Sequence, residues 1–115
     1  MNVVSLIGNL ATDVDLREVG ADKRVATFLL AVDRPTKDGE ADFFRIAVWD
    51  RQGETCHERL AKGSRVAIDG RLRSRSWEDE GKRRTAVEVV ANRVEFLSRP
   101  RDAAGTPFEA ATTPS

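Results

Sequence analysis

The chain has 115 residues, the length of one ordinary domain. Its 19 basic and 19 acidic side chains cancel to a net charge of zero, which argues against a protein that coats nucleic acid through bulk positive charge. Its apolar runs are too short to span a bilayer, and its N-terminus lacks the basic start of a secretory signal. One cysteine and one histidine leave almost no ligands for zinc and no partner for an internal disulfide. We therefore expect a cytoplasmic protein with no membrane segment, no metal site and no cofactor.

The neutral total hides an uneven distribution of charge. Residues 1–57 carry seven basic and ten acidic side chains, whereas residues 58–115 carry twelve basic and nine acidic ones. Residues 100–115 contain three prolines and many small side chains, and they show no periodicity, which is typical of disorder. We therefore predict a folded domain over residues 1–99 and a disordered C-terminal tail over residues 100–115.

Most of the folded region alternates apolar and polar side chains, as strands do. A first strand is expected over residues 3–10, with a bend at Gly8, and it could continue to residue 19. Two more strands are expected over residues 24–34 and 42–50, with a turn at Asp38 and Gly39 between them.

One segment, residues 52–62, has the pattern of a helix. Cys56 and Leu60 are spaced to share one face, and Gly63 stands where a C-cap glycine belongs. Two long strands are expected to follow, over residues 65–77 and 84–97. This order predicts an all-β fold with one short helix, a five-stranded Greek-key barrel of the OB-fold type.

Two of the expected strands combine aromatic and basic side chains on one face. In the third strand and just beyond it, the face opposite the apolar one reads Phe43, Arg45, Ala47, Trp49 and Arg51. In the fourth strand, the corresponding face reads Arg71, Arg73, Arg75 and Trp77, and after the loop come Lys82, Arg83 and Arg84. Asp69 shares this face, unless Gly70 marks a bulge that resets the register.

Such faces suit single-stranded nucleic acid. Flat bases stack on exposed rings, and the phosphates need cations nearby. A duplex hides its bases, so we expect a preference for single strands.

Each of these features also has a structural explanation. Trp49 could pack at an end of the barrel, Trp77 could act as a hinge, and the arginine stripe could be a solvated face that deters edge pairing. His57 reads as an exposed helix residue and Cys56 as a small core hydrophobe. The presence of two aromatic and basic faces on adjacent elements favours binding. No paired carboxylates, histidine constellation or glycine-rich phosphate loop indicates catalysis, so we expect no enzyme and no catalytic residues.

Four blocks carry a resemblance to a known family. They read VSLIGNL (residues 4–10), DFFRIAVW (42–49), LAKGSRV (60–66) and IDGRLRSRSW (68–77). In this order and spacing they resemble the bacterial single-stranded DNA-binding protein family over nearly all of residues 1–99. The resemblance implies an OB-fold that assembles as a homotetramer, with the first strand pairing across a dyad. It implies base stacking on Phe43, Trp49 and Trp77, and phosphate contacts from Arg34, Arg45, Arg71, Arg73 and Arg75.

The chain departs from the family pattern in three places. Thr36 stands where many members carry a further stacking tryptophan, so one stacking platform should be missing. Phe44 replaces a histidine that is linked to oligomerisation in the family. After Pro100 the only acids are Asp102 and Glu109, whereas typical members end in an acidic, apolar tip that recruits replication and repair enzymes, so we expect no such recruitment.

These observations together predict a sequence-independent binder of single-stranded DNA. We expect it to act as a homotetramer in DNA replication, recombination or repair, in the cytoplasm and associated with the nucleoid. The alternative is an OB-fold protein-interaction or replication-restart module with weak DNA binding.

Overall fold

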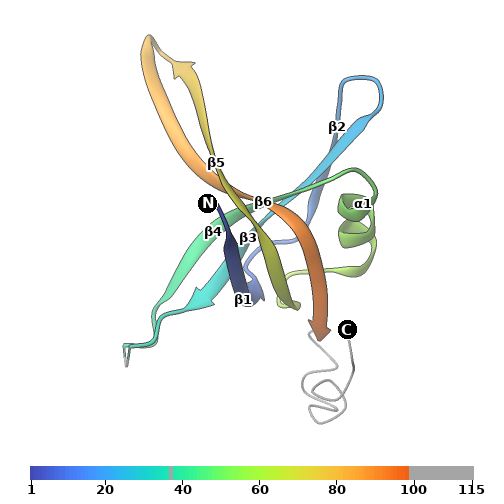
Figure 1. Ribbon diagram of the computed structural model, residues 1–115, viewed down its shortest axis with the longest axis vertical. Helices are drawn as coiled ribbons and strands as arrows, with labels where there is room; N and C mark the ends of the chain where they lie inside the picture. The colour runs from blue at the N-terminus through green and yellow to red at the C-terminus, as the bar shows by residue number, and fades with distance from the viewer. Residues whose placement is uncertain (37, 99–115) are drawn as a thin grey trace.

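The computed structural model describes residues 1–36 and 38–98, which form six strands and one helix (Figure 1). In chain order these are β1 (Val4–Leu10), β2 (Asp15–Val19), β3 (Lys23–Asp33), β4 (Ala41–Trp49), α1 (Asp50–Arg59), β5 (Arg65–Asp79) and β6 (Lys82–Ser98). The tail predicted over residues 100–115 lies outside the described residues. Within the described part of the chain, no helix is long and apolar enough to cross a membrane.

Five of the strands close into a ring. β1 pairs antiparallel with β5 along most of its length and with β3 through Asn9 and Leu10, while β6 pairs antiparallel with β5 and parallel with β4. β4 then pairs antiparallel with β3, which completes the ring. The helix connects the third and fourth strands of the ring. This arrangement confirms the prediction of an all-β OB-fold barrel with one short helix.

β2 is a separate strand rather than a continuation of β1. After Leu10 the chain turns across β3, where the Ala11 N–H donates to the Leu29 carbonyl at 2.8 Å. The Thr12 hydroxyl accepts a hydrogen bond from the Leu29 N–H at 3.1 Å, and Val14 is buried. These contacts end β1 before β2 begins, and β2 then pairs only with β3 among the described strands.

The core lies inside the ring, where alternate side chains of each strand point inward. Its most buried members come from several strands and include Leu30, Ile46, Val48, Val66 and Ile68. The helix contributes Cys56, which is 1% exposed, and the residue after the helix, Leu60, is also buried. Both predictions for this helix face are confirmed, and His57 is exposed as expected.

The helix begins and ends earlier than the sequence pattern indicates. It covers Asp50–Arg59, and Leu60 is its C-cap, with an N–H that donates to the Cys56 carbonyl at 2.8 Å. The prediction of a C-cap at Gly63 is wrong. Gly63 has a φ of 96° in the following turn, where its N–H donates to the Leu10 carbonyl. Leaving the helix at Leu60 lets this side chain enter the core.

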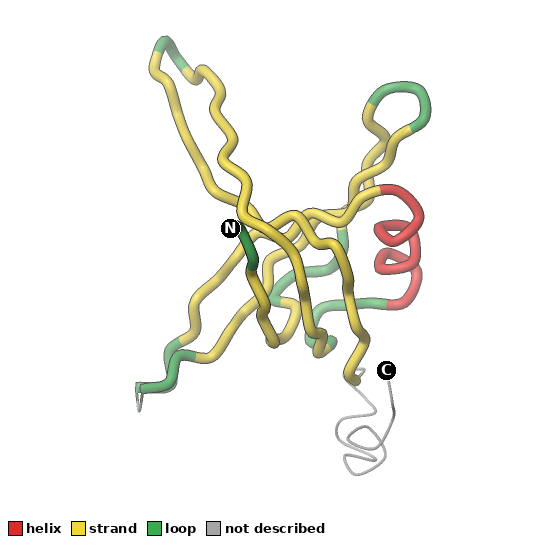
Figure 2. Tube along the Cα trace, in the orientation of Figure 1, coloured by secondary structure: helices red, strands yellow, loops and turns green. Residues whose placement is uncertain are grey.

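The longest strands, β5 and β6, form a hairpin that extends well beyond the ring (Figure 2). The hairpin is irregular at its base. Asp69 lies opposite Arg93 and Gly70 lies opposite Ala91, so Asn92 has no partner in β5. A register irregularity at Gly70 is therefore present, but the extra residue belongs to β6, and the alternation of β5 continues unbroken.

Candidate nucleic-acid interface

The first part of the candidate interface is the outer face of β4. Phe43 is 60% exposed, whereas Phe44 packs against the core cluster. The Arg45 side chain is about half exposed and Trp49 is partly buried on the same face. Ala47, which lies between them, is buried. The face therefore offers one open ring, one arginine and one partly covered indole.

The stripe of β4 ends at Trp49. Asp50 has a φ of 55°, which turns the chain out of the strand and into the first turn of α1. Alternation does not continue through such a turn, so Arg51 lies on the helix. The prediction that Arg51 extends the β4 face is wrong.

The second part of the interface is one face of the β5–β6 hairpin. Paired positions across the two strands share a face. Arg73 lies opposite Glu88, and Trp77 lies opposite Arg84. Arg75, between them in β5, shares this face. Trp77 is 41% exposed. Because β4 pairs with β6 next to Glu88, the outer faces of β4, β6 and β5 form one continuous surface.

The centre of this surface is an ion-pair cluster that the sequence did not reveal. The Glu88 side chain is only 3% exposed, and its Oε2 accepts a hydrogen bond from Arg73 Nη2 at 2.7 Å. Its Oε1 lies 3.3 Å from Arg45 Nε and 3.5 Å from Arg75 Nη1. Three of the predicted phosphate contacts thus converge on one carboxylate. The one available signal was a lone acid between two valines of a strand.

The hairpin tip gathers cations around Trp77. The Arg75 guanidinium carbon lies 5.2 Å from the centre of the Trp77 ring, which is within the range of cation–π attraction. A pocket at this place is lined by Trp77, Lys82, Arg83, Arg84 and Thr85. Arg84 is also paired with Asp79 at 3.3 Å. The tip therefore combines a ring with three cations, of which Arg84 is paired with an acid, although Glu78, Asp79 and Glu80 bring an equal number of negative charges to the same loop.

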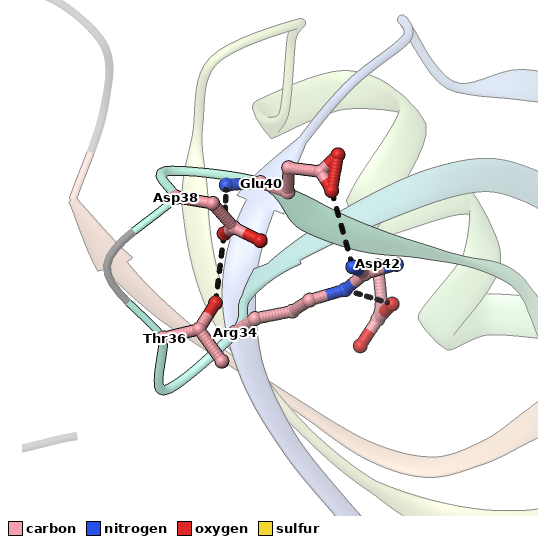
Figure 3. A network of polar contacts seen from close by, with 5 residues as sticks. All are labelled: Arg34, Thr36, Asp38, Glu40 and Asp42. Carbon is pink, nitrogen blue, oxygen red and sulfur yellow. Dashed lines mark hydrogen bonds and ion pairs between the residues drawn. The ribbon is translucent and has the colours of Figure 1, made fainter.

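Arg34 stands apart from these residues, in the loop between β3 and β4 (Figure 3). Its guanidinium is 2.8 Å from Asp42 Oδ1 and 3.2 Å from Glu40 Oε2. In the same loop the Glu40 N–H and the Thr36 hydroxyl donate to Asp38, and they hold the pKa of this carboxyl below its ordinary value. Thr36, the position expected to lack a stacking ring, is thus part of a polar turn. Two carboxylates around one guanidinium leave Arg34 little positive field for a phosphate.

The other predicted cations differ in their surroundings. Arg71 lies opposite Val90 in β6 and is exposed, as are Lys82 and Arg83 at the tip. Among residues 1–36 and 38–98, none of these three takes part in an ion pair. Asp69 is at the base of the hairpin, where its Oδ1 accepts a hydrogen bond from the Ser5 hydroxyl in β1 at 2.8 Å. The described part of the chain contains no group of three or more potential metal ligands.

The geometry agrees with comparisons to known proteins. Residues 1–97 match the model of the single-strand binding protein family. The chain belongs to this family. It is 44% identical over 110 residues to single-stranded DNA-binding protein 3 of Listeria innocua, an alignment that covers 91% of this chain and 69% of the relative.

Two further members of the single-strand binding protein family show similar agreement. The single-stranded DNA-binding protein of Clostridium tetani is 46% identical over 102 residues, which cover 84% of this chain and 70% of that protein. The protein of the same name from Treponema pallidum is 39% identical over 102 residues, which cover 84% of this chain and 58% of that protein. Both alignments thus include most of this chain but leave 30% of the first relative and 42% of the second outside the match.

Proposed function

We propose that this chain binds single-stranded DNA without sequence preference, by stacking bases on aromatic rings and neutralising phosphates with arginines. The observation that carries the proposal is the continuous surface of β4, β6 and β5. It presents Phe43, Trp49 and Trp77 together with Arg45, Arg73 and Arg75. Membership of the family and the names of the relatives favour this function over an interaction module with weak DNA binding.

The physical basis of the proposal is base stacking combined with phosphate neutralisation. Each stacked base contributes about 1–3 kcal/mol and tolerates any base, because every base has a flat face. Each phosphate that is neutralised adds about 0.7 to the salt dependence of binding to a single strand. Bases are inaccessible in a duplex, so stacking gives single strands the advantage. The role is binding alone, and it would serve DNA replication, recombination or repair in the cytoplasm, at the nucleoid.

The proposal extends to assembly as a homotetramer. Among the described pairs, Val4–Gly8 of β1 pair with β5 alone, so much of the other edge of this strand is open. Val3, just before this strand, is 70% exposed, and Ile7, within it, is 52% exposed. An open strand edge beside exposed apolar side chains is a surface on which a second copy of the chain could pair. We also propose that residues 1–99 form the binding domain and that residues 100–115 form a tail outside it.

The experiment that tests the proposal is a titration with oligo-dT, followed by tryptophan fluorescence. We expect quenching by the single strand, weaker binding to a duplex, and falling affinity with added salt. Trp49→Ala and Trp77→Ala should each lower the affinity by about tenfold, which corresponds to about 1.4 kcal/mol for the loss of one stacked base. Val87→Ala is the matched control, because Val87 is an exposed apolar residue of β6 that lies opposite Ser74, on the other face of the hairpin, and this variant should bind like the wild type. A wild-type protein that shows no preference for the single strand over the duplex would contradict the proposal.

A further inference from the structure

Glu88 is the one charged side chain among the described residues that is buried. It lies on the face proposed to bind a polyanion, where a negative charge would ordinarily weaken binding. Its carboxylate nevertheless stays between three guanidinium groups, from Arg45, Arg73 and Arg75. A buried acid in this place therefore needs a role that outweighs its repulsion of phosphates.

The geometry separates an inner and an outer side of each arginine. The three side chains remain 48%, 43% and 40% exposed, although each has a guanidinium nitrogen within 3.5 Å of the buried carboxylate. A guanidinium carries five N–H donors, and a contact to one carboxylate oxygen uses only one or two of them. Most donors of the cluster therefore remain available to an incoming phosphate.

The same carboxylate also offsets the repulsion between the arginines. Three guanidinium groups that share a small area repel one another and would spread into solvent without an anion between them. With Glu88 in place, the cluster keeps a net charge of +2. Arg75 in turn lies against the Trp77 ring, so the arrangement reaches one of the proposed stacking residues.

We propose that Glu88 is a positioning residue of the interface, an internal counter-ion that holds Arg45, Arg73 and Arg75 as a three-armed site for backbone phosphates. This role depends on the proposed binding of single-stranded DNA. It predicts a change in affinity opposite to the one expected from charge alone, because removing a negative charge from the binding face should weaken the binding of a polyanion. Glu88 acts through the arginines and does not itself touch the strand.

Two substitutions at Glu88 separate position from charge. Glu88→Gln removes the charge and keeps the shape, whereas Glu88→Asp keeps the charge and withdraws the carboxylate by one methylene. The matched control is Asp79→Asn, which removes one negative charge from the same hairpin at an exposed pair with Arg84. Ordering one freed side chain on binding lowers affinity by a factor of roughly two to ten. We therefore expect both Glu88 variants to bind oligo-dT about tenfold more weakly, and Asp79→Asn to bind as tightly as the wild type or about twofold more tightly.

The salt dependence gives a readout that a purely structural role would not move. Loss of an ordered phosphate contact should lower the slope of log affinity against log salt by about 0.7 in the Glu88→Gln variant. If Glu88 only repels phosphates, the same variant binds more tightly and its slope becomes steeper, which overturns the proposal. A Glu88→Asp variant with wild-type affinity also overturns it, because charge without position would then suffice.

Two further results keep the test decisive. Circular dichroism shows whether the Glu88 variants fold. Should they not fold, Arg73→Lys replaces them, since lysine keeps the charge but lacks the planar fork that reaches Glu88. Weaker dT binding by this variant supports the proposal, and unchanged binding refutes it. If the wild type itself does not bind oligo-dT, the proposed function fails; if the wild type binds and the variants act as simple charge changes, only the positioning role fails.

Discussion

Replacing Gly70 by alanine tests the close backbone contact at the base of the β5–β6 hairpin. A Cβ at this position would collide with the carbonyl oxygen of Val90 and lie 3.0 Å from the Cα of Ala91. Both obstacles belong to the backbone, so no side-chain rotation relieves them and the two strands must separate. Overpacking costs about 1–3 kcal/mol, and a weakened ladder hydrogen bond costs about 1 kcal/mol more. We therefore expect Gly70→Ala to lower the free energy of unfolding by about 2–4 kcal/mol.

Urea denaturation followed by tryptophan fluorescence measures this loss. The matched control is Gly20→Ala, because Gly20 has a φ of 72° and open space around its Cβ position. That variant should show only the backbone penalty of an L-residue, about 1–2 kcal/mol. The two variants should also differ in DNA binding, since only Gly70 lies where the hairpin joins the ring. A Gly70→Ala protein that unfolds at the wild-type urea concentration and binds oligo-dT equally well would refute the reasoning.

Three further predictions concern the thiol, the β3–β4 loop and the open strand edge. Burial raises the pKa of Cys56 to about 11 from 9.0, so the linked stability is fully present below about pH 9 and has fallen by about 2 kcal/mol when the pH reaches about 11. Urea unfolding should show this fall, and Cys56→Ala should abolish it. Arg34→Gln should change the affinity for oligo-dT less than twofold, and a loss as large as that of Arg73→Gln would contradict its neutralisation by two carboxylates. Ile7→Asp should reduce the assembly seen by native mass spectrometry to smaller species, whereas Val19→Asp on β2 should leave it intact.

The features that depend on neighbours along one strand could be predicted from the sequence. Alternation needs only the residues of the strand itself, and it correctly placed Phe43 outside and Phe44 against the core. The order of strands and helix likewise follows from local patterns, and it led to the correct barrel. The spacing of Cys56 and Leu60 identified the buried side of the helix for the same reason.

The features that depend on strand neighbours distant in sequence, on how a loop closes, or on an unusual backbone angle could not be predicted. Glu88 belongs to the interface because β6 lies between β4 and β5 in the sheet. The pattern of residues along one strand does not reveal which strands pair. Arg34 looked like a free cation because its partners Glu40 and Asp42 approach it only when the loop closes. Arg51 was placed on the wrong element because the positive φ of Asp50 ends β4 at Trp49.

The length of the β5–β6 hairpin has a consequence for motion. From Arg73 in β5 and Val87 in β6 outward to the tip, the two strands pair only with each other among the described residues. A lone two-stranded ribbon is marginally stable in water. Amide hydrogen exchange should therefore become faster along the hairpin from the ring towards Gly81. The backbone of Trp77 should then open far more often than the backbone of Phe43 in β4. An indole on a flexible backbone segment can adjust its tilt to bases of different size, which suits a surface that binds single strands of any sequence.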